Sequence, residues 1–140
     1  MLKSLYINAT DVRKDFSRTI DNVIHIKPQL IKRTHNYLVF IEEKELNRLL
    51  SNLKLHVNFT REDNGTYIAT NSVIEDVFFT GATKQEAMDS LCKELIEYAN
   101  EYYDEYDLYS KTPNRKDHAA YVMRILSLSS IEAVKEMLDA

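Results

Sequence analysis

Hydrophobic and polar positions in the first third of the chain follow first a strand period and then a helical period. Residues Leu5–Ile7 fit a short strand, and Asn8 offers a side chain that can cap a helix. Apolar residues then recur at intervals of four, four and three, which gives one buried helical face that breaks near Phe16 into two short helices. The residues of that face are Val12, Phe16, Ile20 and Val23.

A hairpin and a further helix are predicted next. Lys27-Pro28 ends the preceding helix, because proline cannot continue one. Residues 29–32 and 37–41 have strand composition around the turn Thr34-His35-Asn36. Residues 42–53 fit a helix whose first turn is acidic, where the helix dipole favours negative charge.

The second half of the chain predicts three strands followed by a long helix. Residues 55–59 alternate apolar and polar, and Glu62-Asp63-Asn64-Gly65 is a strong turn signal before a returning strand at 66–70. A loop at 71–75 leads to a third strand at 77–80, which Gly81 ends. Thr83 and Glu86 form a capping box that opens a helix to about Tyr106.

Two short helices are expected at the end of the chain, after the linker Thr112-Pro113-Asn114. The first covers about 116–126, and the second is capped by Ser129 and extends to Leu138. The predicted class is α+β, with segments 1–53, 54–110 and 111–140. Whether the final helices pack on the preceding segment, wrap a protein partner or contact DNA stays open; their apolar faces favour the first two.

Composition excludes several classes of protein. The chain has two glycines in 140 residues, too few for a phosphate-binding glycine-rich motif. Its single cysteine excludes an internal disulfide and a CxxC zinc site. The start of the chain lacks the features of a signal peptide, and no apolar run is long enough to span a membrane. We therefore expect a cytoplasmic protein.

Net charge is unevenly distributed along the chain. The whole chain carries −4, which argues against a nucleic-acid binder. Residues 1–54, however, hold ten Lys or Arg and six Asp or Glu, a net +4, and the remainder is −8. Such asymmetry indicates two partners of opposite charge, unless it is random surface variation.

The first segment carries a family resemblance. Its motifs are Ala9-x-x-x-Arg13-x-x-Phe16-Ser17, then Val23, then Leu30-Ile31-x-Arg33, then the strand 38–41 and a Glu-rich helix start. This pattern, over residues 7–50, resembles the Phd/YefM antitoxins, although the turn lacks the usual glycine after Arg33. The resemblance implies a homodimer, or a higher oligomer, that binds operator DNA, represses its own operon and engages a toxin through its C-terminal part.

Polar residues on the first helices and the hairpin are the candidate DNA contacts. Arg13 is the best candidate for a base edge, since arginine pairs bidentately with guanine. Lys14 and Arg18 suit phosphates, and Asn8 or Thr10 could donate to a phosphate at the helix start. The full set is Asn8, Thr10, Arg13, Lys14, Ser17, Arg18 and Arg33. A solvated helix face is the alternative.

The second segment has a resemblance of its own. The order strand, Asn-Gly turn, strand, strand, and then Gly81-x-Thr83-x-x-Glu86-Ala87 opening a long helix, resembles the HicB antitoxin domain, a partial RNase H-like unit. Such domains usually carry a proline in the loop that is 71–75 here. The resemblance implies that this segment blocks a toxin, often a small RNA-cleaving protein of the HicA kind.

Acidic and tyrosine residues interleave near the end of the long helix. Acidic side chains at a helix C-terminus interact unfavourably with the negative end of the helix dipole, and a cationic partner would offset this repulsion. Tyrosine is enriched at interfaces, and a basic RNA-cleaving toxin is complementary to such a surface. The candidate toxin contacts are Glu94, Tyr98, Glu101, Tyr102, Glu105, Tyr106 and Tyr109. The alternative is that Tyr98, Tyr102 and Tyr106 form core under a sheet.

Catalysis is not expected. The carboxylates on the predicted strands do not converge as a metal nuclease requires, and the four histidines show no ligand spacing and suit surface positions. Cys92 lies in mid-helix and suits core packing. The sequence predicts no enzyme, no metal site and no cofactor.

Three functions follow from these observations. The first is an antitoxin that represses its operon and neutralises a toxin. The second is a DNA-binding regulator whose C-terminal segment binds a different protein or a ligand. The third is an interaction adaptor with no role at DNA.

Overall fold

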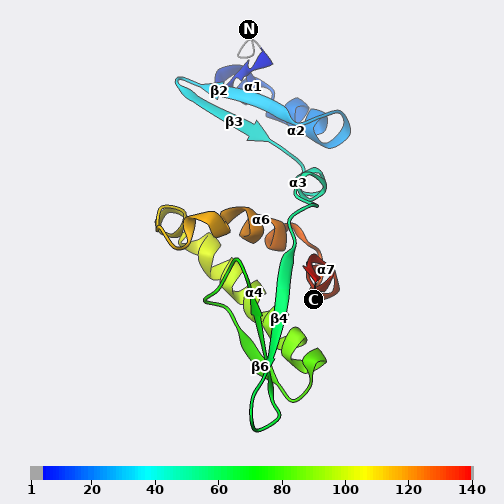
Figure 1. Ribbon diagram of the computed structural model, residues 1–140. Helices are drawn as coiled ribbons and strands as arrows, with labels where there is room; N and C mark the ends of the chain where they lie inside the picture. Colours follow the sequence, from blue (N-terminus) through cyan, green and yellow to red (C-terminus); the bar gives the residue numbers. More distant parts are fainter. Residues whose placement is uncertain (1–4, 140) are drawn as a thin grey trace. The chain divides into compact units, whose positions relative to one another are not determined.

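The computed structural model describes residues 5–139 (Figure 1), and the chain divides into two compact units, Met1–Leu46 and Asn47–Ala140. The boundary falls within helix α3 (Glu43–Leu49). Each unit contains a small mixed sheet and its own helices, so the predicted α+β class is confirmed. None of the helices in residues 5–139 has the length and apolar character to cross a membrane.

The sheet of the first unit has three strands. β1 (Ile7–Asn8) lies parallel to β2 (Gln29–Arg33), which pairs antiparallel with β3 (Asn36–Phe40). The first strand is two residues long and begins at Ile7, later than the expected 5–7. It is short because helix α1 (Ala9–Lys14) follows at once; Asn8 makes no side-chain capping bond there, contrary to expectation.

The expected break in the first helical stretch is confirmed. Helix α1 ends at Lys14, and α2 (Phe16–His25) begins after Asp15, whose backbone (φ −143°, ψ 69°) is not helical. The Asp15 carboxylate accepts a hydrogen bond from Arg18 N at 3.2 Å, which satisfies a free amide of the new helix. Aspartate therefore both interrupts the helix and restarts it.

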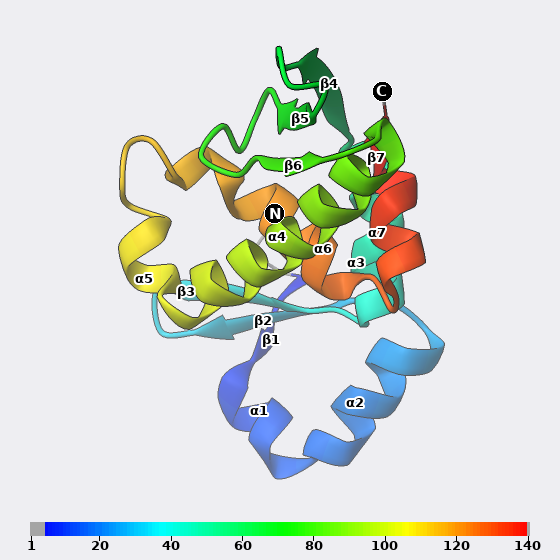
Figure 2. The ribbon, with the colours of Figure 1, turned by 90° about the horizontal axis from the view of Figure 1, so that it is seen from below.

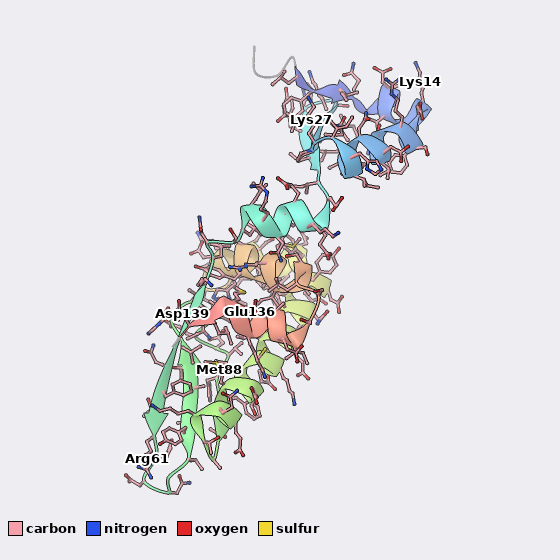
Figure 3. The ribbon with its side chains drawn as sticks, turned by 90° about the vertical axis from the view of Figure 1, so that its right-hand side faces the viewer. Lys14, Lys27, Arg61, Met88, Glu136 and Asp139 are labelled. Atoms are coloured by element: carbon pink, nitrogen blue, oxygen red, sulfur yellow. The ribbon has the colours of Figure 1, made fainter. Side chains whose placement is uncertain are left out.

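The sheet of the second unit has the strand order β6-β5-β4-β7. β4 (Leu55–Arg61) and β5 (Tyr67–Asn71) form the predicted hairpin, with Arg61 near its tip (Figure 3). β6 (Phe79–Gly81) pairs antiparallel with β5, and β7 (Leu138–Asp139) pairs parallel with β4. The third strand thus starts at Phe79 and not at Val77, because 74–77 forms a turn closed by Val77 N and Ile74 O at 3.1 Å.

Helix α4 (Lys84–Asp104) packs against one face of this sheet, with α6 (Ala119–Ser127) and α7 (Ile131–Met137) beside it (Figure 2). The capping box is confirmed: Thr83 Oγ1 accepts from Glu86 N, and Glu86 reaches back to Ala82 N. The C-terminal helices pack on α4, and their apolar side chains Val122, Ile125, Val134 and Met137 are buried in one core with those of the sheet.

Several helix ends differ from the prediction. Helix α3 stops at Leu49, not Leu53, and α4 stops at Asp104, before the separate short helix α5 (Tyr106–Tyr109). The segment after the linker begins with a short 3-10 helix, η2 (Lys116–His118). The last helix is capped by Ser130, whose hydroxyl accepts from Ala133 N at 3.1 Å, and not by Ser129; Leu138 belongs to β7.

Arg124 is a buried residue that the sequence does not single out. The structure leaves it 8 % exposed, with Nη1 donating to the carbonyls of Ser51 and Leu53 just beyond α3. Arg124 thus satisfies two carbonyls of the segment that connects α3 to β4.

Candidate functional site

The first unit contains a depression of about 690 Å³ lined by three cationic side chains. Arg13 comes from α1, and Lys32 and Arg33 come from β2. Asp11 is the one acid in its lining, and Asn8 and Thr10 lie on the same rim. The fold therefore brings together the helix and hairpin positions that the sequence had proposed separately.

The remaining candidate DNA contacts lie outside that depression. Lys14 and Ser17 are exposed on the helices. The Lys14 side chain projects from α1 (Figure 3), and its Nζ lies 3.8 Å from Oδ1 of Asp11. Arg18 borders a second, smaller depression together with Asp11 and Asp15. All seven candidates are exposed, and the cations extend beyond the depression along α1 and α2.

The second unit contains an acidic groove of about 240 Å³. One wall is Asp76, Val77 and Phe78, the segment that enters β6. The other wall is α4, whose carboxylates at 94, 97 and 101 recur at helical spacing and therefore share one face. We call the set Asp76, Val77, Phe78, Glu94, Glu97, Tyr98, Glu101 and Arg115 the acidic groove.

Two of the candidate toxin contacts are core residues. Tyr102 is fully buried and donates its hydroxyl to Arg115 O at 2.9 Å, and Tyr98 is nearly as buried, so neither presents its ring as a docking surface. The pattern of every fourth residue fits core packing as well as surface exposure, which is why the sequence did not separate the two. Tyr106, Glu101 and Glu105 are exposed, and Glu94 and Tyr109 are half-buried.

Arg115 lines the acidic groove and contacts two tyrosine rings, of which Tyr98 also lines the groove. The Arg115 guanidinium lies 4.6 Å from the Tyr109 ring and 5.7 Å from the Tyr98 ring, and 3.8 Å from the Asp76 carboxylate. Tyr109 donates its hydroxyl to Glu101 at 3.0 Å, and this bond raises the pKa of Tyr109. Burial raises the pKa of Tyr98 to about 12, so its hydroxyl stays protonated.

His118 is buried, contrary to the surface position expected for the histidines. Its Nδ1 lies 2.6 Å from the Tyr98 hydroxyl, and burial lowers its pKa, so the ring is held neutral. His25, His35 and His56 are exposed. Cys92 is fully buried and burial raises its pKa, which confirms a packing role. Within residues 5–139, no three His, Cys, Asp or Glu side chains gather into a metal site.

The described residues thus place a cationic depression on one unit and an acidic groove on the other. Comparison with known proteins gives the class of the protein. The chain matches, over residues 1–140, the family PHD_like, described as antitoxin of toxin-antitoxin, RelE/RelB, TA system. The chain therefore belongs to this antitoxin family. It is an antitoxin of a type II toxin–antitoxin system, and the prediction that it is not an enzyme is confirmed.

A solved structure is similar along almost the whole chain. It is the crystal structure of an antitoxin part of a candidate toxin/antitoxin system from Syntrophomonas wolfei subsp. wolfei. The two chains are 37% identical, the match covers 95% of each, and the TM-score is 0.89. No curated protein matches the chain.

Proposed function

We propose that this antitoxin is a homodimer whose first unit binds operator DNA and represses its own operon, while its second unit neutralises an RNA-cleaving toxin. The DNA-binding segment is 1–53, the toxin-binding segment is 54–110, and 111–140 supports the latter. The observation that carries the proposal is the depression in which Arg13, Lys32 and Arg33 converge from a helix and a hairpin.

Charge and geometry support the DNA half. Three cations and one acid give the depression a net positive charge. Attraction between such a charge and the DNA phosphates supplies the sequence-independent part of the binding affinity. Arg13 is the base-reading candidate, since its planar fork can pair with guanine. Lys14 and Arg18 extend the cationic surface along the helices and suit phosphates, and Asn8, Thr10 and Ser17 can donate to phosphates at its edge.

Exposed apolar residues support dimerisation of the first unit. β3 is an edge strand whose Tyr37, Leu38 and Val39 are 40–54% exposed. Consecutive residues point to opposite faces of a strand, so Leu38 and Val39 expose apolar area on both faces of β3, and no strand among the described residues pairs with its outer edge. A second copy would cover this surface, and two cationic depressions could then meet two half-sites of an operator.

The acidic groove supports the toxin half. A toxin that cuts RNA needs a positively charged surface, and the carboxylates of α4 are complementary to it. The unit also has the order of three strands and a capped helix that resembles the HicB domain. We therefore assign toxin neutralisation to this unit, with Glu94, Glu101, Glu105, Tyr106 and Tyr109 retained as surface contacts.

Binding to the DNA upstream of this chain's own reading frame tests the repressor half. In a mobility-shift titration we expect the wild type to bind specifically and Arg13→Ala to lose about 1–3 kcal/mol, with weaker discrimination against unrelated DNA. If Arg13→Ala binds this DNA as tightly as the wild type does, the assignment of Arg13 to a base contact is wrong. If the wild type does not bind this DNA even at low salt, the proposed repressor function is wrong.

Co-expression with the product of the adjacent reading frame tests the toxin half. We expect that product alone to arrest growth and this chain to restore growth. A frame whose product is harmless, or an arrest that this chain does not relieve, favours the alternative of a DNA-binding regulator with a different protein or ligand on its second unit.

A further inference from the structure

One edge of the second unit's sheet is open. β6 pairs with β5 along one side, and no strand among the described residues pairs with its other side. Phe78 and Phe79 are 58% and 41% exposed, and Thr80 is exposed as well. A strand exposed in this way presents unpaired backbone amide and carbonyl groups, to which another extended chain can add.

The acidic groove continues directly from this edge. Its first wall, Asp76 to Phe78, is the segment that enters β6, and its second wall is the carboxylate-bearing face of α4. A chain that pairs with β6 would therefore pass along the groove. Phe78 places an exposed ring against which an apolar side chain of that chain can pack.

The groove has carboxylates without a countercharge. Asp76 pairs with Arg115, and Glu101 accepts from Tyr109. Within residues 5–139, no cation lies within ion-pair distance of Glu94 or Glu97. The last turn of α4 contains no basic residue, so nothing on the helix offsets the negative end of its dipole.

We propose that the open edge of β6 accepts an extended Lys/Arg-bearing segment of the toxin as a fifth strand, with its cations on Glu94 and Glu97. The inference rests on the proposed toxin-neutralising function and adds where and how the toxin docks. Side chains alternate in a strand, so cations at every second position of that segment face α4. A second copy of this chain is a poor occupant, because β6-to-β6 pairing would bring two acidic grooves together.

Hydrogen exchange on the complex with the adjacent-frame product tests the backbone part. We expect the amides of residues 77–80 to exchange at least tenfold more slowly in the complex than in the free chain, while those at the β4–β5 turn (62–65) keep their rates. Unchanged rates at 77–80 in a formed complex would overturn strand addition. Protection that appears in the free chain on raising its own concentration would assign the edge to a second copy and overturn the toxin as occupant.

A charge-reversal pair tests the side-chain part. The double variant Glu94→Lys/Glu97→Lys is expected to bind the adjacent-frame product 10- to 100-fold more weakly, with most of the change removed at high salt. The matched control, Glu62→Lys/Glu136→Lys, makes the same charge change at exposed positions of the same unit and is expected to bind as the wild type does. Equal affinities for the two double variants would overturn the docking site.

The outcomes separate this inference from the proposed function. If the wild type does not relieve the arrest caused by the adjacent-frame product, toxin neutralisation itself fails. If the wild type relieves it, and the groove variant does so equally well without protection of 77–80, neutralisation stands and docking at β6 is wrong.

Discussion

The hydroxyl of Tyr98 lies 2.6 Å from Nδ1 of His118, and both side chains are buried. Burial raises the pKa of Tyr98 to about 12 and lowers the pKa of His118, so a protonated phenol is hydrogen-bonded to a neutral imidazole. Neutral His118 therefore joins the segment after the linker to α4. The hydrogen bond satisfies two polar groups that would otherwise be buried without partners.

This pair makes the second unit sensitive to acid. Burial lowers the pKa of His118 from 6.5, so below about pH 6.5 the unfolded chain takes up a proton that the folded chain resists. The stability contributed by neutral His118 is present above pH 6.5 and is lost as the pH falls through the lowered value. In urea unfolding at pH 7.5 and 5.5, we expect His118→Gln to lose less stability on acidification than the wild type.

An exposed histidine provides the control for that experiment. His35 lies on the exposed hairpin turn of the first unit, so His35→Gln should keep the acid sensitivity of the wild type. If His118→Gln and His35→Gln respond alike to acidification, His118 is not the group responsible.

Thr34 occupies a left-handed backbone conformation, with φ of 54°, at the hairpin turn that also borders the cationic depression. A branched side chain is strained there, since its Cβ approaches the carbonyl oxygen. We expect Thr34→Gly to stabilise the hairpin by about 0.5–1 kcal/mol, measured from native-state hydrogen exchange of the β2 and β3 amides. His35→Gly, at a position without positive φ, should not stabilise it; equal gains would show that the turn is not strained.

Local patterns predicted the elements of both units but not all of their ends. The spacing of Val12, Phe16 and Ile20 predicted the helices, and Thr83 with Glu86 predicted the start of α4, because a cap and a hydrophobic period are local in sequence. The ends that were misplaced depend on distant partners. The segment that follows α3 is held by Arg124 of α6, which donates to Ser51 O and Leu53 O. Leu138 is a strand residue because β4 lies beside it.

The candidate site shows the same division. Exposure of Arg13 and Arg33 was predictable from charge, but their meeting in one depression depends on the register of β2 with β1. Tyr98 and Tyr102 show the converse case. Their spacing defines a face of α4, and only the packing of Arg115 and His118 decides that this face is covered.

Buried Asn71 is a further residue that no local pattern singles out. Its amide donates to the carbonyls of Ile74 and Val77, and its oxygen accepts from the amides of Val73 and Ile74. These bonds close the loop that leads to β6 and the acidic groove. The four partners follow Asn71 in sequence, but an asparagine at a strand end gives no sign that it will be buried.

Gly81 permits close contact between β6 and the start of α4. A Cβ at this position would lie 2.8 Å from the Glu86 carbonyl carbon and 2.9 Å from Ala87 Cα, and these are backbone atoms that cannot rotate away. We expect Gly81→Ala to destabilise the second unit by about 1–3 kcal/mol, measured by urea unfolding. Thr60→Ala, an exposed change in the same sheet, should cost under about 0.5 kcal/mol. A loss in Gly81→Ala no larger than in Thr60→Ala would show that the close approach is not needed.

Lys14 and Lys27 are both exposed on the first unit but lie at separate places on it (Figure 3). Lys14 lies on α1 near Arg13, whereas Lys27 follows the end of α2. If Lys14 holds a phosphate, Lys14→Ala should weaken binding to specific and unrelated DNA alike and reduce the slope of log K against log salt by about 1. Lys27→Ala removes the same charge and should leave the slope unchanged. Equal reductions in both variants would mean that net charge, and not a contact at Lys14, sets the affinity.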